Sequence, residues 1–182
     1  MRRPRLLLLA VMLCGPNLVA GDDFEAALAK AEQGDVAAQF NVGQMYSQGK
    51  GVSANATEAV KWWRKAAEQG DADAQCNVGT AYGSGESVQK DQTEAVKWYR
   101  KAAEQGHAAG QYNLGNAYAK GLGVLRDLGT AVQWYRDAAK HGDSLSAFYQ
   151  RILGATYANG GDRKSTRLNS SHERLSRMPS SA

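Results

Sequence analysis

The apolar residues of this chain recur at intervals that place them on one face of a helix. Within the segment Val36–Gln48, the residues Ala38, Val42 and Tyr46 follow one another at steps of four, as they do in an amphipathic α-helix. Gly49 comes directly afterwards, where a residue in the left-handed conformation commonly ends a helix. The pattern therefore predicts a helix over Val36–Gln48.

A second helix is predicted to begin near Asn55. Asn55 lies three positions before Glu58, which is the spacing of a capping box, and asparagine is a preferred N-cap because its side chain accepts a backbone hydrogen bond. Asp91 with Glu94 repeats the arrangement, and Asp127 keeps the cap in a later segment. We therefore expect three second helices with capped starts.

The second helix carries two apolar stripes. They consist of Ala59, Trp62 and Ala66 and of Val60, Trp63 and Ala67. A surface helix of an ordinary domain shows one stripe, so two stripes predict burial against two neighbours, as in a solenoid whose helix pairs cover one another. The expected structural core of the repeats is Tyr46, Trp62, Tyr82, Trp98, Tyr118 and Trp134.

The helix pair repeats along the chain with a fixed period. Glycines stand 36 residues apart at Gly34, Gly70, Gly106 and Gly142, and they delimit three full units, residues 34–69, 70–105 and 106–141. A further glycine recurs inside each first helix, as Gly43, Gly79 and Gly115. Because a mid-helix glycine costs roughly 0.5–1 kcal/mol relative to alanine, its recurrence indicates that another helix approaches closely there.

The unit resembles the Sel-one-like repeat family, which is related to tetratricopeptide repeats but has a slightly longer period. In the second unit the resemblance is carried by Ala74-Gln75, Asn77, Gly79, Tyr82, Gly85, Asp91, Ala95, Trp98-Tyr99 and Lys101-Ala102-Ala103. It covers Asp22 to about Gly160, and it implies an all-α fold, a right-handed αα-superhelix of helix-turn-helix repeats. Ser87 departs from the pattern by replacing the second loop glycine, so we expect that loop to be less tightly bent.

The two ends of the chain differ from the repeats. Residues 1–20 combine a basic start with a short apolar run, which is typical of a secretory signal peptide and too short to span a bilayer. Residues 21–33 are expected to form an N-terminal capping helix, and residues 142–161 a truncated fourth repeat. Residues 162–182 resemble the translation of a sequencing-library adapter, and we interpret them as a disordered, adapter-derived artefact. We expect a periplasmic or secreted protein without a membrane span after signal cleavage.

The basic balance of the whole chain comes from its ends. The chain holds 22 Lys and Arg against 18 Asp and Glu, which would suggest an anionic partner such as nucleic acid. Residues 21–161 alone hold 14 basic and 16 acidic residues. We therefore expect no nucleic-acid partner.

The chemistry-bearing residues of the repeats form no recognisable catalytic or metal site. Cys76 stands among apolar residues, as expected of a small buried core residue. His107 and His141 lack a cysteine or carboxylate at ligand spacing. We expect no enzyme activity, no cofactor and no metal. The alternative is a hydrolase acting on β-lactam or cell-wall substrates, as proposed for cysteine-rich relatives of this family.

The remaining hypothesis is a scaffold or adaptor of the bacterial cell envelope or secreted space, binding a protein or peptide in its concave groove. First helices mainly line such a groove, and amide side chains can pair with a peptide backbone. The candidate groove residues are Gln39, Asn41, Gln44, Gln75, Asn77, Thr80, Gln111, Asn113 and Asn116. The alternative for the three asparagines is a structural bond to a neighbouring turn or loop. The family resemblance implies roles in signalling, envelope regulation or host interaction.

Overall fold

The chain folds into consecutive helices. The computed structural model describes residues 19–140 together with residues 151 and 154. Between residues 19 and 140 it contains seven α-helices and no strand. They are α1 (Val19–Glu32), α2 (Val36–Gln48), α3 (Ala56–Glu68), α4 (Ala72–Ser84), α5 (Gln92–Glu104), α6 (Ala108–Lys120) and α7 (Leu128–Lys140). The helix predicted over Val36–Gln48 is confirmed as α2.

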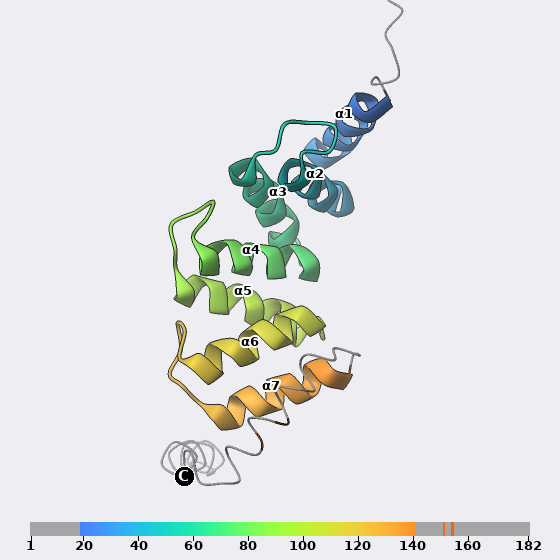
Figure 1. Cartoon of the computed structure of the whole chain (residues 1–182). Coiled ribbons are helices and arrows are strands. Elements are labelled where there is room, and N and C mark those ends of the chain that lie inside the picture. Colours follow the sequence, from blue (N-terminus) through green and yellow to red (C-terminus); the bar gives the residue numbers. More distant parts are fainter. Residues whose placement is uncertain (1–18, 141–150, 152–153, 155–182) are drawn as a thin grey trace, which may run out of the picture.

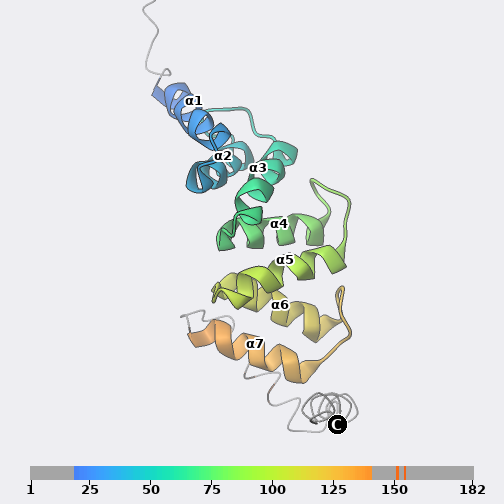
Figure 2. The ribbon, with the colours of Figure 1, turned by 180° about the vertical axis from the view of Figure 1, so that it is seen from behind.

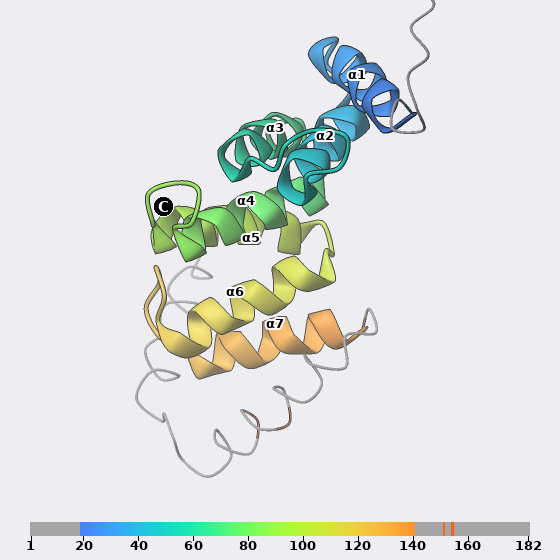
Figure 3. The ribbon, with the colours of Figure 1, turned by 45° about the horizontal axis from the view of Figure 1, so that its top comes forward.

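The helices pack in the order of the sequence and build one elongated stack (Figure 1). The most extensive contacts join α2 with α3, α4 with α5 and α6 with α7, and each pair then packs on the next. The view from behind shows the same order (Figure 2). The axes of α2 and α3 point in a different direction from those of α4 to α7 (Figures 1 and 3). The stack therefore twists, and the predicted all-α superhelix of helix pairs is confirmed.

Local signals fix where the helices of the first unit begin and end. The Asp35 side chain accepts a hydrogen bond from the backbone N–H of Ala38 at 2.7 Å and caps the start of α2. Gly49 closes the helix in the left-handed conformation, with φ +68°. Asn55 accepts from the backbone N–H of Glu58 at 3.1 Å and caps α3. These short-range contacts explain why the pattern of single residues predicted the boundaries.

The predicted capping box is present only in part. In a full box, the Glu58 side chain would return to the backbone N–H of Asn55. That N–H instead donates to the carbonyl oxygen of Tyr46 at 2.8 Å. Glu58 pairs with Lys61 at 2.6 Å on the helix surface. The N-cap is therefore correct, and the reciprocal bond is replaced because the loop backbone supplies the acceptor.

The loop within the second unit differs from the other two, as expected. Gly51 and Gly123 adopt φ of +73° and +69° in the first and third loops. Ser87 takes the equivalent position of the second loop, and among the described residues only glycines have positive φ. The backbone N–H of Glu86 there donates to the Ser84 hydroxyl oxygen at 3.3 Å. A serine side chain thus replaces part of the backbone turn.

Tryptophans join each helix pair to its neighbour. Trp98 of α5 packs in one buried cluster with Ala66 and Ala67 of α3 and with Ala74 and Val78 of α4. Trp62 and Trp134 belong to the clusters before and after it, and the tyrosines at positions 46, 82 and 118 are half-buried against the same three clusters. The large ring beside small alanines indicates that the core is built between units rather than inside each one.

Helix α1 covers the N-terminal end of the stack. Phe24 of α1 is buried against α2. The positions of α1 that would face the first helix of a preceding unit are polar. Asp23 stands where α3 has Ala59, and Lys30 stands where α3 has Ala66. Both are exposed, which is the property expected of a capping helix in a repeat protein.

Residues outside the described part include several predicted segments. The predicted signal peptide up to residue 18, the predicted truncated fourth repeat apart from residues 151 and 154, and the adapter-like tail lie there, whereas Val19 and Ala20 of the predicted signal peptide belong to α1. No helix among the described residues has the length and apolar character needed to cross a membrane.

Candidate functional site

The first helices lie on the inner side of the stack. Among helices that do not follow each other in the sequence, the main contact joins α4 with α6, and both are first helices. A stack whose units approach most closely at their first helices curves toward those helices. The concave surface of the second and third units is therefore found on the side of α4 and α6.

Two hollows open between consecutive repeats. The first inter-repeat pocket, of about 300 Å³, is lined by Ser47, Ala56, Ala59, Val60, Trp63, Asn77, Thr80, Ala81, Ser84, Glu86 and Ser87. The second inter-repeat pocket, of about 180 Å³, is lined by Gly83, Gln92, Val96, Tyr99, Asn113, Asn116, Ala117 and Leu122. Every lining position of the second pocket is a position of the first shifted by 36 residues. The repeat therefore produces the same hollow twice.

Each pocket combines a buried apolar base with uncharged polar sides. In the first, Val60 is buried, Asn77 is half-buried and Thr80 is exposed. Glu86 is the one charged residue among those that line the two pockets. Amide and hydroxyl groups both donate and accept hydrogen bonds, so these surfaces suit an uncharged ligand with exposed polar groups, such as a peptide backbone.

Aromatic residues of the second helices hold the polar side chains in place. The Tyr99 hydroxyl donates to the Thr80 hydroxyl oxygen at 3.4 Å, and the Tyr135 hydroxyl donates to the Asn116 side-chain oxygen at 2.7 Å. Burial raises the pKa of Tyr99, so its phenol keeps the proton that it donates. Trp63 occupies the equivalent position of the first unit, and its buried Nε1 has no partner among the described residues.

Sequence reasoning did not single out Trp63 and Tyr99 as pocket residues. The sequence feature that could have identified these two residues is the glycine that recurs inside each first helix. A Cβ atom added to Gly43 would lie 2.4 Å from the Trp63 ring, and one added to Gly79 would lie 2.7 Å from the Tyr99 ring. The absence of a side chain at these glycines lets the aromatic ring reach the inner side.

Four of the nine predicted groove residues line the two pockets: Asn77, Thr80, Asn113 and Asn116. The side chain of Asn77 has no hydrogen-bond partner among the described residues. Asn113 donates to the Cys76 sulfur at 3.6 Å, which ties α6 to α4. Asn41 is exposed and Gln44 is half-buried, and both lie outside the two pockets.

The three predicted groove glutamines are buried between repeats. Gln39, Gln75 and Gln111 are each about 5% exposed. Their side-chain nitrogens donate to the carbonyl oxygens of Ala31, Ala67 and Ala103 at 3.1, 3.1 and 3.2 Å. Each bond therefore satisfies an acceptor at the end of the preceding helix. This corrects the prediction that the glutamines line the groove, since their amides are not accessible to a partner.

A second glutamine completes two of these junctions. Gln69 donates to the side-chain oxygen of Gln39 at 2.7 Å, and Gln105 donates to that of Gln75 at 2.8 Å. In each case the end of a second helix is bonded to the first helix of the same unit. The junction is a buried polar network whose role is to fix how the units stack.

Cys76 does not present a reactive thiol. It is 7% exposed, and burial raises its pKa to about 11. Because the thiolate is the nucleophilic form of cysteine, the neutral thiol of Cys76 acts as a small core residue at physiological pH.

Two Ser-x-x-Lys sequences are present, Ser47 with Lys50 and Ser87 with Lys90. In acylating enzymes this motif supplies a serine nucleophile. Here Gly49 ends α2 between Ser47 and Lys50, and the second pair lies in the loop before α5. Ser47 also lines a pocket, but no hydrogen bond joins either serine to its lysine within the described residues. The motif therefore lacks its catalytic arrangement.

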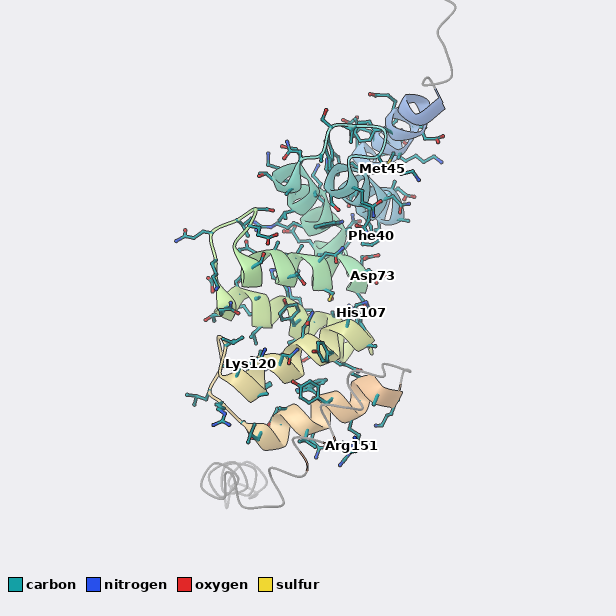
Figure 4. All side chains as sticks on the ribbon, viewed as in Figure 1. Phe40, Met45, Asp73, His107, Lys120 and Arg151 are labelled. Atoms are coloured by element: carbon teal, nitrogen blue, oxygen red, sulfur yellow. The ribbon has the colours of Figure 1, made fainter. Side chains whose placement is uncertain are left out.

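His107 has a structural role at the junction of the second and third units. Its Nδ1 accepts a hydrogen bond from the backbone N–H of Gly110 at 3.1 Å and caps α6. Its Nε2 lies 2.9 Å from the Asp73 carboxylate (Figure 4). Within the described residues, no group of three or more His, Cys, Asp or Glu side chains is placed to hold a metal ion.

The repeat profile decides the family. The Sel1 repeat matches residues 36–71, 72–107 and 108–143, which together make up more than half of the chain. The chain belongs to the Sel1-repeat family. Sel1-repeat proteins are typically non-catalytic scaffolds for protein interaction. Each matched span begins two residues after the glycine that marks the predicted unit.

Solved structures agree with this assignment. The Sel1 repeat protein from Oxalobacter formigenes is 38% identical, with a TM-score of 0.66, over 71% of this chain and 98% of that one. The c5321 protein of uropathogenic Escherichia coli, a protective antigen with an SLR fold, is 40% identical, with a TM-score of 0.72, over 78% of this chain and 30% of that one. This Sel1-repeat chain thus spans less than a third of c5321.

A more distant structure shares the fold alone. The Helicobacter pylori cysteine rich protein B is 20% identical, with a TM-score of 0.58, over 73% of this chain and 96% of that one. A search of curated proteins found no match.

Proposed function

We propose that this Sel1-repeat chain is a non-catalytic scaffold of the bacterial cell envelope or secreted space that binds an uncharged, extended segment of a partner protein. The observation that carries the proposal is the pair of equivalent inter-repeat pockets on the concave side. An extended chain presents backbone donors and acceptors along its length, and two successive units each present an equivalent amide group in their pocket.

The pockets provide both parts of such recognition. Asn77 and Asn113 offer side-chain amides to the backbone of the bound segment, while Val60 and Val96 form the apolar base of the two hollows. A partner side chain that enters a hollow gains apolar burial, and its backbone is held at the sides. Because Glu86 is the only charge in the lining, binding should depend little on salt concentration.

A displayed library of uncharged ten-residue peptides tests this proposal. We expect the purified chain to enrich peptides that bind to it, and we expect Asn77→Ala and Asn113→Ala each to weaken a selected peptide about fivefold to tenfold, as for the loss of one net hydrogen bond. Isothermal titration calorimetry measures the change.

Asn41→Ala is the matched control, because Asn41 is the equivalent asparagine of α2 but lies outside both pockets. Its affinity for the same peptide should stay within about twofold of the unchanged chain, below the effect of one net hydrogen bond. Equal losses in all three variants, or a library that yields no binder, would contradict the assignment of the groove. Nitrocefin turnover by the purified chain would contradict the non-catalytic assignment.

The proposed location outside the cytoplasm is supported by the signal-like residues 1–20. A basic start followed by a short apolar run is the pattern of exported proteins. Fractionation of cells that express the full chain would decide it, since recovery in the cytoplasm alone would refute export.

A further inference from the structure

A further hollow among the described residues lies on α5 next to the second inter-repeat pocket, with which it shares Val96. It has a volume of about 410 Å³ and is lined by Thr93, Val96, Lys97, Arg100, Lys101, Glu104, Gly123 and Val124. We refer to it as the basic pocket. Three of its residues are cations and one is an anion, although the chain between residues 21 and 161 has more acidic than basic residues. The lining of this hollow is therefore more basic than the chain as a whole.

Gly123 brings the following loop against α5 and closes one side of the basic pocket. The loop between α6 and α7 reaches the start of α5 (Figure 1). A Cβ atom added to Gly123 would lie 2.2 Å from the carbonyl oxygen of Gln92 and 2.7 Å from the backbone nitrogen of Thr93. This backbone contact places Val124 against Val96 in one apolar cluster. The pocket thus has an apolar base beneath its charged sides.

The cations are held in position without being neutralised inside the pocket. Arg100 uses one nitrogen to donate to the Tyr118 hydroxyl at 2.9 Å, which leaves its other donors for a ligand. The Lys101 ammonium lies 4.0 Å from the centre of the Trp98 ring. Lys97 pairs with Glu94 at 2.8 Å in an exposed ion pair, and such pairs contribute little and exchange readily.

The loop beside the basic pocket exposes leucines that the other units lack. Leu125 is 91% exposed, and Leu122, which lines the neighbouring second inter-repeat pocket, is 40% exposed. The loop of the second unit has Glu86 and Gln89 at the equivalent positions. The helix that corresponds to α5 there is α3, and it carries basic residues at the three equivalent positions, 61, 64 and 65. Large exposed apolar residues beside a hollow mark interaction sites. Among the helices that the structure describes, only α5 combines the cations with an apolar loop.

We propose that the basic pocket binds a short acidic segment of a second protein, with one apolar side chain between carboxylates. The apolar side chain would lie on Val96 and Val124, and the carboxylates would pair with Arg100 and Lys101. A flat anionic membrane fits less well, because it would also meet Glu94, which lies on the same helix outside the pocket lining. The chain would then have two adjoining binding surfaces, an uncharged one on the inner side and a basic one on α5, which share the side chain of Val96.

Fluorescence anisotropy with a labelled peptide tests this proposal on the purified chain. The probe is an end-capped peptide with a central leucine and two glutamates on each side. We expect saturable binding that weakens as sodium chloride is raised. We expect binding to fall at least tenfold when glutamine replaces the four glutamates, and clearly when serine replaces the leucine.

Two lysine variants locate the site. Lys101→Glu should weaken the probe at least tenfold, whereas Lys65→Glu, the equivalent change on α3, should alter its affinity less than twofold. If circular dichroism shows that Lys101→Glu lowers the helix content, Lys101→Gln provides a milder change. Lys101→Gln should still lower the affinity for the probe several-fold. Asn77→Ala, in the first inter-repeat pocket, should leave it unchanged.

Several outcomes would overturn the proposal. The first is the absence of binding up to about 1 mM probe, where any remaining affinity is worth less than roughly 4 kcal/mol. The second is an equal loss of probe affinity in Lys65→Glu and Lys101→Glu. The third is equal affinity for the glutamate peptide and the glutamine peptide. Sedimentation of the chain with phosphatidylserine vesicles, combined with no binding of the peptide, would assign the surface to membranes instead.

Discussion

Replacing Trp98 by alanine should lower the free energy of unfolding by about 3–5 kcal/mol. Trp98 is 6% exposed and fills the space between α3 and α4 beside Ala66 and Val78. Removing the indole would leave a cavity at the contact between two units, and the alanines around it are too small to fill it. Urea unfolding followed by far-ultraviolet circular dichroism measures the loss.

Trp98→Phe is the control for this prediction. The Trp98 ring nitrogen is buried and has no hydrogen-bond partner among the described residues, so phenylalanine forfeits no bond and keeps most of the apolar contact. We expect a loss well below that of the alanine variant. If Trp98→Ala cost less than roughly 1 kcal/mol, far below a core truncation, the ring would not be part of the core between the repeats.

Replacing Gly79 by alanine should also destabilise the chain, by about 1–3 kcal/mol. Alanine usually favours a helix over glycine by roughly 0.5–1 kcal/mol, so propensity alone predicts the opposite sign. The new Cβ, however, would lie 2.7 Å from the Tyr99 ring and 3.2 Å from the carbonyl oxygen of Ala95. The ring is held by α5 and by its bond to Thr80, so α4 and α5 would have to separate. The same urea measurement applies.

A double-mutant cycle with Tyr99→Ala identifies the cause. Without the ring, the change from glycine to alanine at position 79 should be neutral or stabilising by up to about 1 kcal/mol, and the difference between the two backgrounds is the coupling energy. A stabilising effect of Gly79→Ala in the presence of Tyr99 would show that the two helices are not in close contact at this glycine.

The sequence predicted the fold well because its determinants are local and repeated. The bounds of α2 follow from Asp35 and Gly49, which lie next to the helix they limit. The 36-residue period then transfers the same assignment to later units. The apolar stripes predicted that Trp98 would be buried between units, and its cluster with Ala67 and Ala74 confirms this.

The candidate site was predicted less completely because it depends on contacts distant in sequence. Gln75 and Asn77 are both polar residues of the same first helix, and periodicity alone does not tell which of them faces a neighbouring unit. Gln75 is buried through its bonds to Ala67 and to Gln105, 30 residues away, while Asn77 lines a pocket. The basic pocket likewise requires knowing that Gly123 lies against Gln92.

The paired glutamines have a consequence for how such a protein can change in length. Gln39 bonds to Ala31 before it and to Gln69 after it, and Gln75 bonds in the same way to Ala67 and Gln105. Each junction recurs with the 36-residue period. An extra copy of 36 residues inserted at a junction therefore brings its own bonds and leaves the bonds on either side unchanged. Duplication can lengthen the chain by whole units, and each addition creates one more hollow for a longer ligand.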